Sequence, residues 1–329
     1  MFEDRPGSSA AAFLIGAISL APASGSALAQ ESYPARSVRI IVPTAPGGPS
    51  DVGARLIAGE LQKRWGKPVV VETRPGAGTI VGSEIVAKAA PDGYTLLVSP
   101  STLATNPASY RKMPYDALTD FAPITQTHFV PNLFVVHPSL PGKSAKDFVA
   151  LAKARPKELS YGSAGHGTNP HLAIELFASM AAVELYHVPY RGTAPGLTDL
   201  LAGRVVMMAT SAMSLLVPHV ESGKLRALGV SSPKRSAALP EVPSLAETVP
   251  GYEAVQWSAL MAPAGTPPGI IRSLHQATVA ILQVPEVRNR LTADSAEIVG
   301  STPEELAAFL RAETSKWAEV AKRAGIEPQ

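Results

Sequence analysis

Short apolar runs alternate along this chain with segments in which apolar residues recur every three or four positions. The runs at 37–42, 68–72 and 95–99 are dominated by Val, Ile and Leu, which is typical of strands buried on both faces of a parallel sheet. A helical pattern that ends at Trp65 follows the first run, and another over 80–86 follows the second. Strands and helices in this order predict a parallel α/β fold.

The same alternation returns further along the chain. Helix starts are marked by Ser144 and Asp147 in capping-box positions, and by Asn169 as an N-cap before Pro170. The strands expected in this part are 159–161, 184–188, 205–209 and 225–230.

Two extended apolar segments, 129–136 and 252–262, have the character of crossovers between two lobes. The segment 103–122 contains prolines, and we expect it to wrap irregularly over the surface. Two crossings of one interface form a hinge, which permits closure around a ligand. The predicted lobes are 30–130 plus 251–329 for the first and 131–250 for the second.

Two helices are expected near the C-terminus, at 268–283 and 302–323. The second has a well-marked start, with Thr302 as cap, Pro303 next and Glu305 in the capping-box position. We expect both helices to pack against the first lobe.

Two glycine-rich turns, 43–51 and 161–171, each follow an apolar run and open a helical segment. Glycine lets the backbone come close to a ligand, and helix N-termini point free N–H groups at anions. Neither turn contains Lys or Arg. The pair predicts a clamp for a carboxylate, in which neutral amides from both turns line one cavity. Asp51 is expected to cap its helix, to lie near the ligand, or to do both.

The composition of the chain excludes several classes of function. The 329 residues include 46% apolar and 17% charged positions, so the chain is globular and long enough for about two domains. A net charge of +2 argues against nucleic-acid binding through a wide basic field. The absence of cysteine excludes disulfides, thiolate nucleophiles and cysteine metal sites.

Several enzyme motifs are imitated but incomplete. Residues 76–78 with Gly82 resemble a dinucleotide fingerprint, but the next strand ends at 99–101 without the acidic residue that would hold a ribose. Ser163 lies in Gly-Ser-Ala-Gly, which is not a nucleophile elbow. No P-loop and no acid/base carboxylate pair can be identified. We therefore expect no enzymatic activity and no cofactor.

The histidines and arginines near the turns leave alternatives open. His166 and His171 are too far apart in sequence for a helical zinc pair, so we expect no metal site; His166 shapes the pocket, and His171 is either structural or ligand-facing. Arg191 and Arg74 either balance an anionic ligand or form surface ion pairs.

The first 29 residues have the pattern of a signal peptide, with an apolar core at 10–20 and a small-x-small site at Ala27-Leu28-Ala29. The basic n-region is weak, since Arg5 is its only base, and a disordered tail is the alternative. Export without disulfides suits a bacterial periplasm, and cleavage is expected after Ala29. Beyond this segment, no apolar stretch is long enough to span a membrane.

The chain resembles the periplasmic solute receptors of tripartite tricarboxylate transporters, the Bug receptor family. The resemblance spans almost the whole mature chain and rests on the order and spacing of short motifs. These lie at 38–43, 46–48, 51, 74–78, 91–97, 113–116, 120–121, 161–168, 171–173, 187–192, 199–201, 223–228, 234–235 and 239–243.

The resemblance implies a two-lobe periplasmic binding protein fold, type II-like, with two crossover segments and a cleft between the lobes. It also implies a small organic carboxylate as ligand and delivery of that ligand to a membrane permease of two subunits; we expect the receptor to be a monomer. The candidate ligand-binding residues are Thr44, Ala45, Gly47, Gly48, Ser50 and Asp51 in the first turn, Gly165, His166, Gly167, Thr168 and His171 in the second, and Ser101, Thr102, Tyr190, Thr210 and Ser211 at other strand ends.

One departure bears on the ligand. Where many members of the family carry an acidic or amide residue, this chain has only small apolar and hydroxyl groups over 209–213. Such a surface disfavours an amino acid. Two other functions stay open: an enzyme that processes a carboxylate in the same cleft, and a ligand-dependent partner of a membrane sensor.

Overall fold

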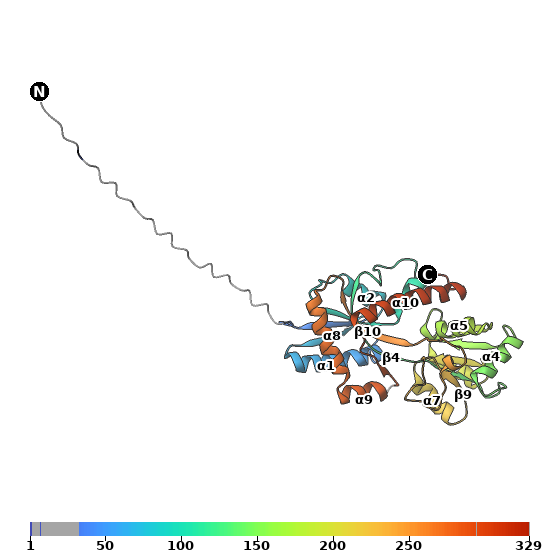
Figure 1. Ribbon diagram of the computed structural model, residues 1–329. Coiled ribbons are helices and arrows are strands. Elements are labelled where there is room, and N and C mark those ends of the chain that lie inside the picture. The colour runs from blue at the N-terminus through green and yellow to red at the C-terminus, as the bar shows by residue number, and fades with distance from the viewer. Residues whose placement is uncertain (2–6, 8–32, 294, 329) are drawn as a thin grey trace. The chain divides into compact units, whose positions relative to one another are not determined.

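A computed structural model describes residues 33–293 and 295–328, together with Met1 and Gly7 (Figure 1). The predicted signal peptide and its cleavage site lie outside the described residues. The account below concerns the compact unit that begins at Tyr33. In the described part of the chain, no helix is both long and apolar enough to cross a membrane.

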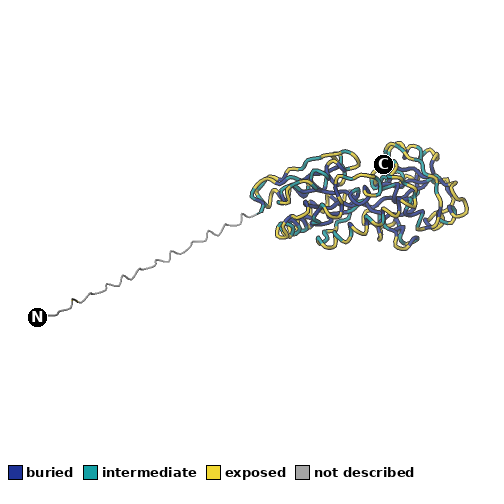
Figure 2. The backbone as a smooth tube through the Cα atoms, turned by 90° about the horizontal axis from the view of Figure 1, so that it is seen from above, coloured by how far each residue is buried: buried dark blue, intermediate teal, exposed yellow. Residues whose placement is uncertain are grey.

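The larger of two sheets has six strands in the order β11-β4-β10-β3-β1-β2. Strand β1 runs parallel to β2 and β3, whereas β10 is antiparallel to β3 and β4. The central strands are almost fully buried, as their apolar composition predicts (Figure 2). The strands are β1 (Val38–Val42), β2 (Val69–Thr73), β3 (Thr95–Pro100), β4 (Phe121–Val130), β10 (Gln256–Pro263) and β11 (Glu297–Ile298).

The helices around this sheet confirm most of the sequence pattern. Both C-terminal helices are present, and Thr302 and Glu305 form the predicted capping box. The helices are α1 (Pro49–Trp65), α2 (Ile80–Ala87), α3 (Thr102–Ser109), α8 (Pro268–Leu282), α9 (Pro285–Ala293) and α10 (Pro303–Arg323), with a short 3₁₀ turn η1 (Ala77–Thr79).

The irregular segment expected over 103–122 is wrong at its two ends, whereas residues 110–120 between them form no helix or strand, as expected. Helix α3 begins at Thr102 and β4 begins at Phe121. The support for α3 comes from distant residues: Leu103 is fully buried, and Asn106 donates a hydrogen bond from Nδ2 to the carbonyl of Gly78 at 2.8 Å. The prolines of this segment could not reveal α3, because the helix is stabilised by contacts with residues that are distant in sequence.

The smaller sheet has five strands in the order β7-β6-β8-β5-β9. Strand β6 is parallel to β7 and β8, and β5 is antiparallel to β8 and β9. Its strands are β5 (Leu133–Val136), β6 (Ser160–Ser163), β7 (Tyr186–Pro189), β8 (Met207–Thr210) and β9 (Arg226–Val230). Its helices are α4 (Ala145–Ala154), α5 (Asn169–Ala181), α6 (Thr193–Leu201) and α7 (Met213–Glu221), with the 3₁₀ turn η2 (Leu245–Glu247).

The chain passes between the two sheets twice, from β4 to β5 and from β9 to β10. The two passages are bound to each other by Asn132, which donates from Nδ2 to the carbonyl of Ala254 at 2.7 Å and from its backbone N–H to Ser231 Oγ at 2.7 Å. The predicted two-lobe α/β architecture is confirmed. The lobe boundaries at 130/131 and 250/251 stay a prediction.

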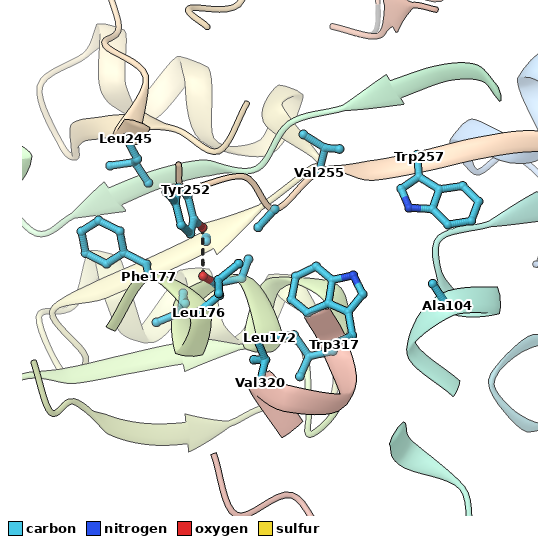
Figure 3. Packing of buried hydrophobic residues seen from close by; sticks show 14 of the residues in the cluster. Ala104, Leu172, Leu176, Phe177, Leu245, Tyr252, Val255, Trp257, Trp317 and Val320 are labelled. Carbon is cyan, nitrogen blue, oxygen red and sulfur yellow. Dashed lines mark hydrogen bonds between the residues drawn. The ribbon is translucent and has the colours of Figure 1, made fainter. Parts of the chain in front are cut away.

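Helix α10 adds a third connection. It contacts α3 and β4, as expected, but also α5. Trp317 and Val320 on α10 pack in one hydrophobic cluster with Leu172 and Leu176 on α5 (Figure 3). The hydrophobic core is therefore continuous from one sheet to the other.

Candidate functional site

The first glycine turn is held in shape by Asp51. Gly47 adopts a positive φ of 84° and donates its N–H to Asp51 Oδ2 at 2.9 Å, so the carboxylate of the third helical residue reaches back over the turn. Arg55 reaches the same carboxylate at 3.0 and 3.1 Å. Burial alone would raise the pKa of Asp51, but the hydrogen bonds from Arg55 and Gly47 bring it below its usual range. Asp51 is therefore ionised near neutral pH and stabilises the turn through these hydrogen bonds.

Two hydroxyls near this turn differ in their surroundings. Ser50 Oγ lies 2.8 Å from Ser258 Oγ on β10 and is engaged there. Thr44 Oγ1 is buried without a hydrogen-bond partner in the described structure, and such a group favours a ligand or a water as partner.

The second glycine turn is organised around His171. Gly165 and Gly167 have positive φ values of 133° and 70°, and the N–H of Gly167 donates to His171 Nδ1 at 3.0 Å. Thr168 Oγ1 donates to the carbonyl of Gly165 at 2.8 Å. Because glycine readily adopts a positive φ, the turn bends back so that backbone groups of Gly167 and Gly165 meet the side chains of His171 and Thr168.

The prediction of Asn169 as N-cap is wrong, since Thr168 is the N-cap of α5. The side chain of Asn169 is used elsewhere: its Oδ1 accepts from Asn132 Nδ2 at 2.8 Å and its Nδ2 donates to the carbonyl of Val255 at 3.4 Å. The second turn is therefore tied to both passages between the sheets.

Two cavities are each lined by residues from both halves of the structure, one half around each sheet. The histidine cavity, of about 570 Å³, lies among the second turn, α3, His187 and the C-terminal residues 324–327. The first-turn cavity, of about 480 Å³, lies among the first turn, Ser211 to Ser214 and residues 238–239. The expectation that both turns line one cavity differs from this structure, in which each turn lines its own. No Lys or Arg is among the described residues that line either cavity.

The predicted site residues divide between these cavities and other positions. The histidine cavity is lined by Thr102, His166, Gly167, Thr168 and His171, and the first-turn cavity by Gly47 and Ser211. The candidates that line neither are Thr44, Ala45, Gly48, Ser50, Asp51, Ser101, Gly165, Tyr190 and Thr210.

Some of these residues have identifiable other partners. Tyr190 donates its hydroxyl to Asp199 Oδ2 at 2.8 Å, and Thr210 Oγ1 accepts from the N–H of Ala212 at 3.1 Å. Arg74 pairs with Glu72 at 2.9 Å, which is the surface ion pair considered for it.

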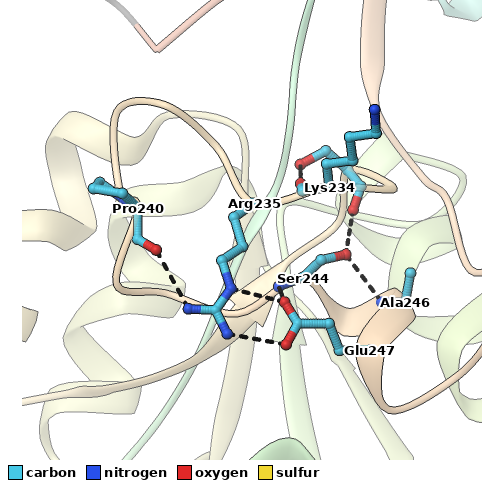
Figure 4. A network of polar contacts seen from close by, with 7 residues as sticks. Lys234, Arg235, Pro240, Ser244, Ala246 and Glu247 are labelled. Carbon is cyan, nitrogen blue, oxygen red and sulfur yellow. Dashed lines mark hydrogen bonds and ion pairs between the residues drawn. The ribbon is translucent and has the colours of Figure 1, made fainter.

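The loop that contributes residues 238–239 is fixed by a polar network (Figure 4). Arg235 donates two hydrogen bonds to the carboxylate of Glu247, at 2.8 and 3.0 Å, and Ser244 caps the turn η2 that contains Glu247. One wall of the first-turn cavity is therefore held by a bidentate pair and a capping box.

His187 is a cavity residue that the sequence reasoning missed. It lies on β7, which pairs in parallel with β6 so that Tyr161 stands opposite His187. The rings of His171 and His187 stack with centroids 4.0 Å apart, and His166 meets both rings edge-on at 5.5 and 4.9 Å. The parallel pairing of two strands that end in glycine turns is the signal that could have placed His187 here.

The electrostatics of this cluster favour neutral rings at His171 and His187. Burial, and then repulsion from His187 and His166, lowers the pKa of His171 to about 3. Burial and repulsion from His166 lower the pKa of His187 to about 4. Burial raises the pKa of Glu175, which accepts a hydrogen bond from the Tyr161 hydroxyl beside the cluster.

Comparisons with known proteins agree on one family. Residues 53–326 match the model of the tripartite tricarboxylate transporter family receptor. Protein BugT of Bordetella pertussis is 39% identical over 300 residues, which cover 90% of this chain and 92% of BugT. A solved R. palustris protein with adipate is 38% identical with a TM-score of 0.73, covering 90% of this chain and 100% of that one. MatC from Rhodopseudomonas palustris with bound malate is 33% identical with a TM-score of 0.69, covering 88% and 99%.

Proposed function

We propose, because this chain belongs to the tripartite tricarboxylate transporter family receptors, that it captures a small organic carboxylate between its lobes and delivers it to a membrane permease of two subunits. The observation that carries the proposal is that each glycine turn lines a cavity together with residues from the opposite half of the structure. The adipate and malate of two solved relatives support a carboxylate as ligand.

The chemistry of the turns suits an anion. Backbone N–H groups at the starts of α1 and α5 supply partial positive charge without Lys or Arg. Hydrogen bonds to a charged group contribute roughly 1.5–3 kcal/mol each, so several amides offset much of the desolvation of a carboxylate. We propose that the candidate residues of both turns contact the ligand when the lobes close.

The site of action follows from the family. We propose that the receptor works in the periplasm as a monomer, after removal of residues 1–29. The description of related solved proteins as a periplasmic transporter and a periplasmic binding protein supports this compartment. Docking of the closed receptor on the permease would release the ligand.

Native mass spectrometry of the freshly purified protein tests the proposal by weighing any co-purified metabolite. Calorimetric titration with malate, succinate, glutarate and adipate then tests carboxylates directly. We expect at least one acid to bind, and adipamide, which replaces both carboxylates by neutral amides, not to bind. Equal binding of adipate and adipamide would refute carboxylate recognition.

Two further measurements separate the proposal from its rivals. Recovery of the bound acid unchanged after long incubation is expected of a receptor, whereas a new product would indicate an enzyme. Uptake of the labelled acid by cells should disappear when the receptor is deleted and return with the intact chain. Persistence of uptake in the deletion strain would argue against a role in transport.

A further inference from the structure

The second glycine turn, to which the proposed function assigns a carboxylate, lines only the histidine cavity. Gly167, Thr168 and His171 belong to this cavity, and no described residue lines both cavities. The opposite wall is α3, and it is close, since a Cβ atom built on Gly167 would lie 3.6 Å from Ser109 Oγ. The rest of a ligand bound at this turn therefore lies in the histidine cavity, and the other side chains of the cavity decide which kind of carboxylate fits.

The two cavities differ in the character of their lining. The first-turn cavity is lined mainly by apolar side chains, among them Val52, Val130, Met213, Val217 and Leu239. The histidine cavity is lined mainly by polar side chains, with Ala324 and Ile326 as aliphatic exceptions among the described residues. An alkyl chain in the histidine cavity would leave hydrogen-bonding groups of the protein without partners, and unpaired polar groups weaken binding. The lining therefore favours a ligand that carries polar groups along its length.

Helix α3 supplies one row of hydrogen-bonding groups. Thr102, Thr105, Asn106 and Ser109 recur every three or four residues, so they lie on one face of the helix, and all four line the cavity. Asn106 is engaged, because its Nδ2 donates to the carbonyl of Gly78 at 2.8 Å. Ser109 Oγ donates to the carbonyl of Thr105 at 3.2 Å and can still accept a hydrogen bond. Thr105 is only 4% exposed, and its hydroxyl has no hydrogen-bond partner among the described residues.

The cavity is acidic rather than basic beyond the turn. Glu175 and Glu327 line it, and no described Lys or Arg does. Glu175 lies one helical turn beyond His171 on α5, roughly 6 Å along the helix axis. Its carboxylate accepts a hydrogen bond from the hydroxyl of Tyr161, which is fully buried and holds the acid in place. A second carboxylate on the ligand would be repelled here, whereas a hydroxyl group of the ligand could donate to Glu175.

The three imidazoles of the cavity suit hydrogen bonding better than metal binding. The nitrogen atoms of His166, His171 and His187 lie within 4.8 Å of one another. However, the His171 and His187 rings are nearly parallel, with an interplanar angle of 11°, so their in-plane lone pairs do not converge on one ion. The N–H of Gly167 donates to Nδ1 of His171, so the proton of the neutral ring is on Nε2. His171 therefore brings a donor to the cavity, to which a hydroxyl oxygen of the ligand could bind.

We propose that this receptor takes a small polyhydroxylated monocarboxylate, and that Glu175 selects against a second carboxylate while Thr105 and Ser109 select for hydroxyl groups on the ligand. The inference rests on the proposed function, because it names the class of carboxylate that the same site binds. A hydroxyl group both donates and accepts, so it can pair with Glu175 and with the donors around it, whereas a carboxylate only accepts and an ammonium group only donates. The cavity volume of about 570 Å³ is usual for a small-ligand site.

Calorimetry with acids of the same six-carbon length separates these features. Gluconate has one carboxylate and a hydroxyl group on every other carbon, hexanoate has one carboxylate and no hydroxyl group, and adipate has two carboxylates and no hydroxyl group. Glucarate combines two carboxylates with hydroxyl groups, and 6-aminohexanoate ends in an ammonium group. We expect gluconate to bind more than about tenfold tighter than each of the others at one pH and ionic strength. This order would distinguish the chain from the relative solved with adipate.

Variants locate the selectivity. Glu175→Gln keeps the shape and an acceptor for Tyr161 but removes the charge, so the preference for gluconate over glucarate should fall about tenfold. Thr105→Val removes a hydroxyl group at nearly constant volume and should weaken gluconate binding about tenfold without changing the affinity for hexanoate. If Thr105→Val fails to fold, Ser109→Ala, at a half-buried position, takes its place. Glu221→Gln, exposed on α7 and lining neither cavity, is the matched control and should leave every affinity unchanged.

The acid series on the intact protein decides the inference even if a variant does not fold. Adipate, glucarate, hexanoate or 6-aminohexanoate binding as tightly as gluconate, or tighter, would overturn the inference and leave the proposed function standing. Unchanged selectivity in a folded Glu175→Gln would also overturn it. Absence of binding by gluconate and by every other acid tested would instead remove the proposed function, and the inference with it.

Discussion

Replacing Asp51 by alanine tests how much the first turn depends on one buried carboxylate. Asp51 is 3% exposed, and its Oδ2 accepts the N–H of Gly47 at 2.9 Å. Alanine leaves that N–H without an intramolecular acceptor and removes the only negative charge in the first turn of α1. The change should therefore loosen the turn and destabilise the protein together.

The size of the effect follows from these contacts. A hydrogen bond to a charged group contributes roughly 1.5–3 kcal/mol. The ion pair with Arg55 adds little, because the arginine side chain is 54% exposed and screened by solvent. We expect a loss of about 2–3 kcal/mol, which is roughly 4–6 °C in melting temperature for a chain of this size, and about tenfold weaker binding of the carboxylate that the titration identifies.

Thermal melting and calorimetry of Asp51→Ala give both quantities, and Asp147→Ala is the matched control. Asp147 also occupies the third position of its helix and accepts the N–H groups of Lys143 and Ser144, but it is exposed on α4. The control should melt slightly lower and bind the same carboxylate normally. Unchanged melting and unchanged affinity in Asp51→Ala would refute the role given to this carboxylate.

The pH dependence of Asp51→Ala provides a second check. The pKa of Asp51 is lowered in the folded state, so its stabilisation is present above the unfolded value of about 4 and is lost as the pH falls further. The difference in unfolding free energy between the two proteins should therefore be constant near neutral pH and shrink in acid. A difference that grows in acid would contradict this assignment.

Two other predictions concern the core. In the folded protein, Glu313 Oε2 accepts hydrogen bonds from the indole N–H groups of Trp257 and Trp317 at 3.1 and 2.9 Å. Glu313→Leu leaves both N–H groups buried without an acceptor, which should lower the free energy of unfolding, measured with denaturant, by about 2–6 kcal/mol. Glu319→Leu, an exposed change on the same helix, should be nearly neutral. Burial lowers the pKa of His128 to about 4. As the pH is lowered from about 6.5 to 4, the free energy of unfolding should therefore fall by about 1.4 kcal/mol per pH unit. His128→Gln should reduce that slope by the equivalent of one proton.

The elements with their own local signals were predictable. Strand β1, helix α1 with its terminating glycine, and the capping boxes of α4 and α10 all follow from residues within one element. The two crossover segments were also visible as extended apolar runs at 129–136 and 252–262. The family resemblance, confirmed by the comparisons, depended on motifs of this local kind.

What could not be predicted depends on contacts between distant residues. Helix α3 is supported by Gly78 on another element, and Asn169 gives up its capping role to bind Asn132. The motif that contains His187 gave no sign of a cavity position, and this residue lines the cavity only because β7 lies beside β6. The separation of the two turns into different cavities likewise depends on the relative placement of the two sheets.

The third connection through α10 constrains how the lobes can move. A hinge of two extended segments could bend freely, but Trp317 is fully buried against α5, and Lys316 donates from Nζ to the carbonyl of Glu253 in the return passage at 3.2 Å. Any rotation that brings the second turn toward the first must carry α10 with α5 or break this packing. Because residues 324–327 of the same C-terminal segment line the histidine cavity, a rotation that carries α10 also moves that wall. The closure proposed for the lobes is thus coupled to the shape of the histidine cavity through one helix.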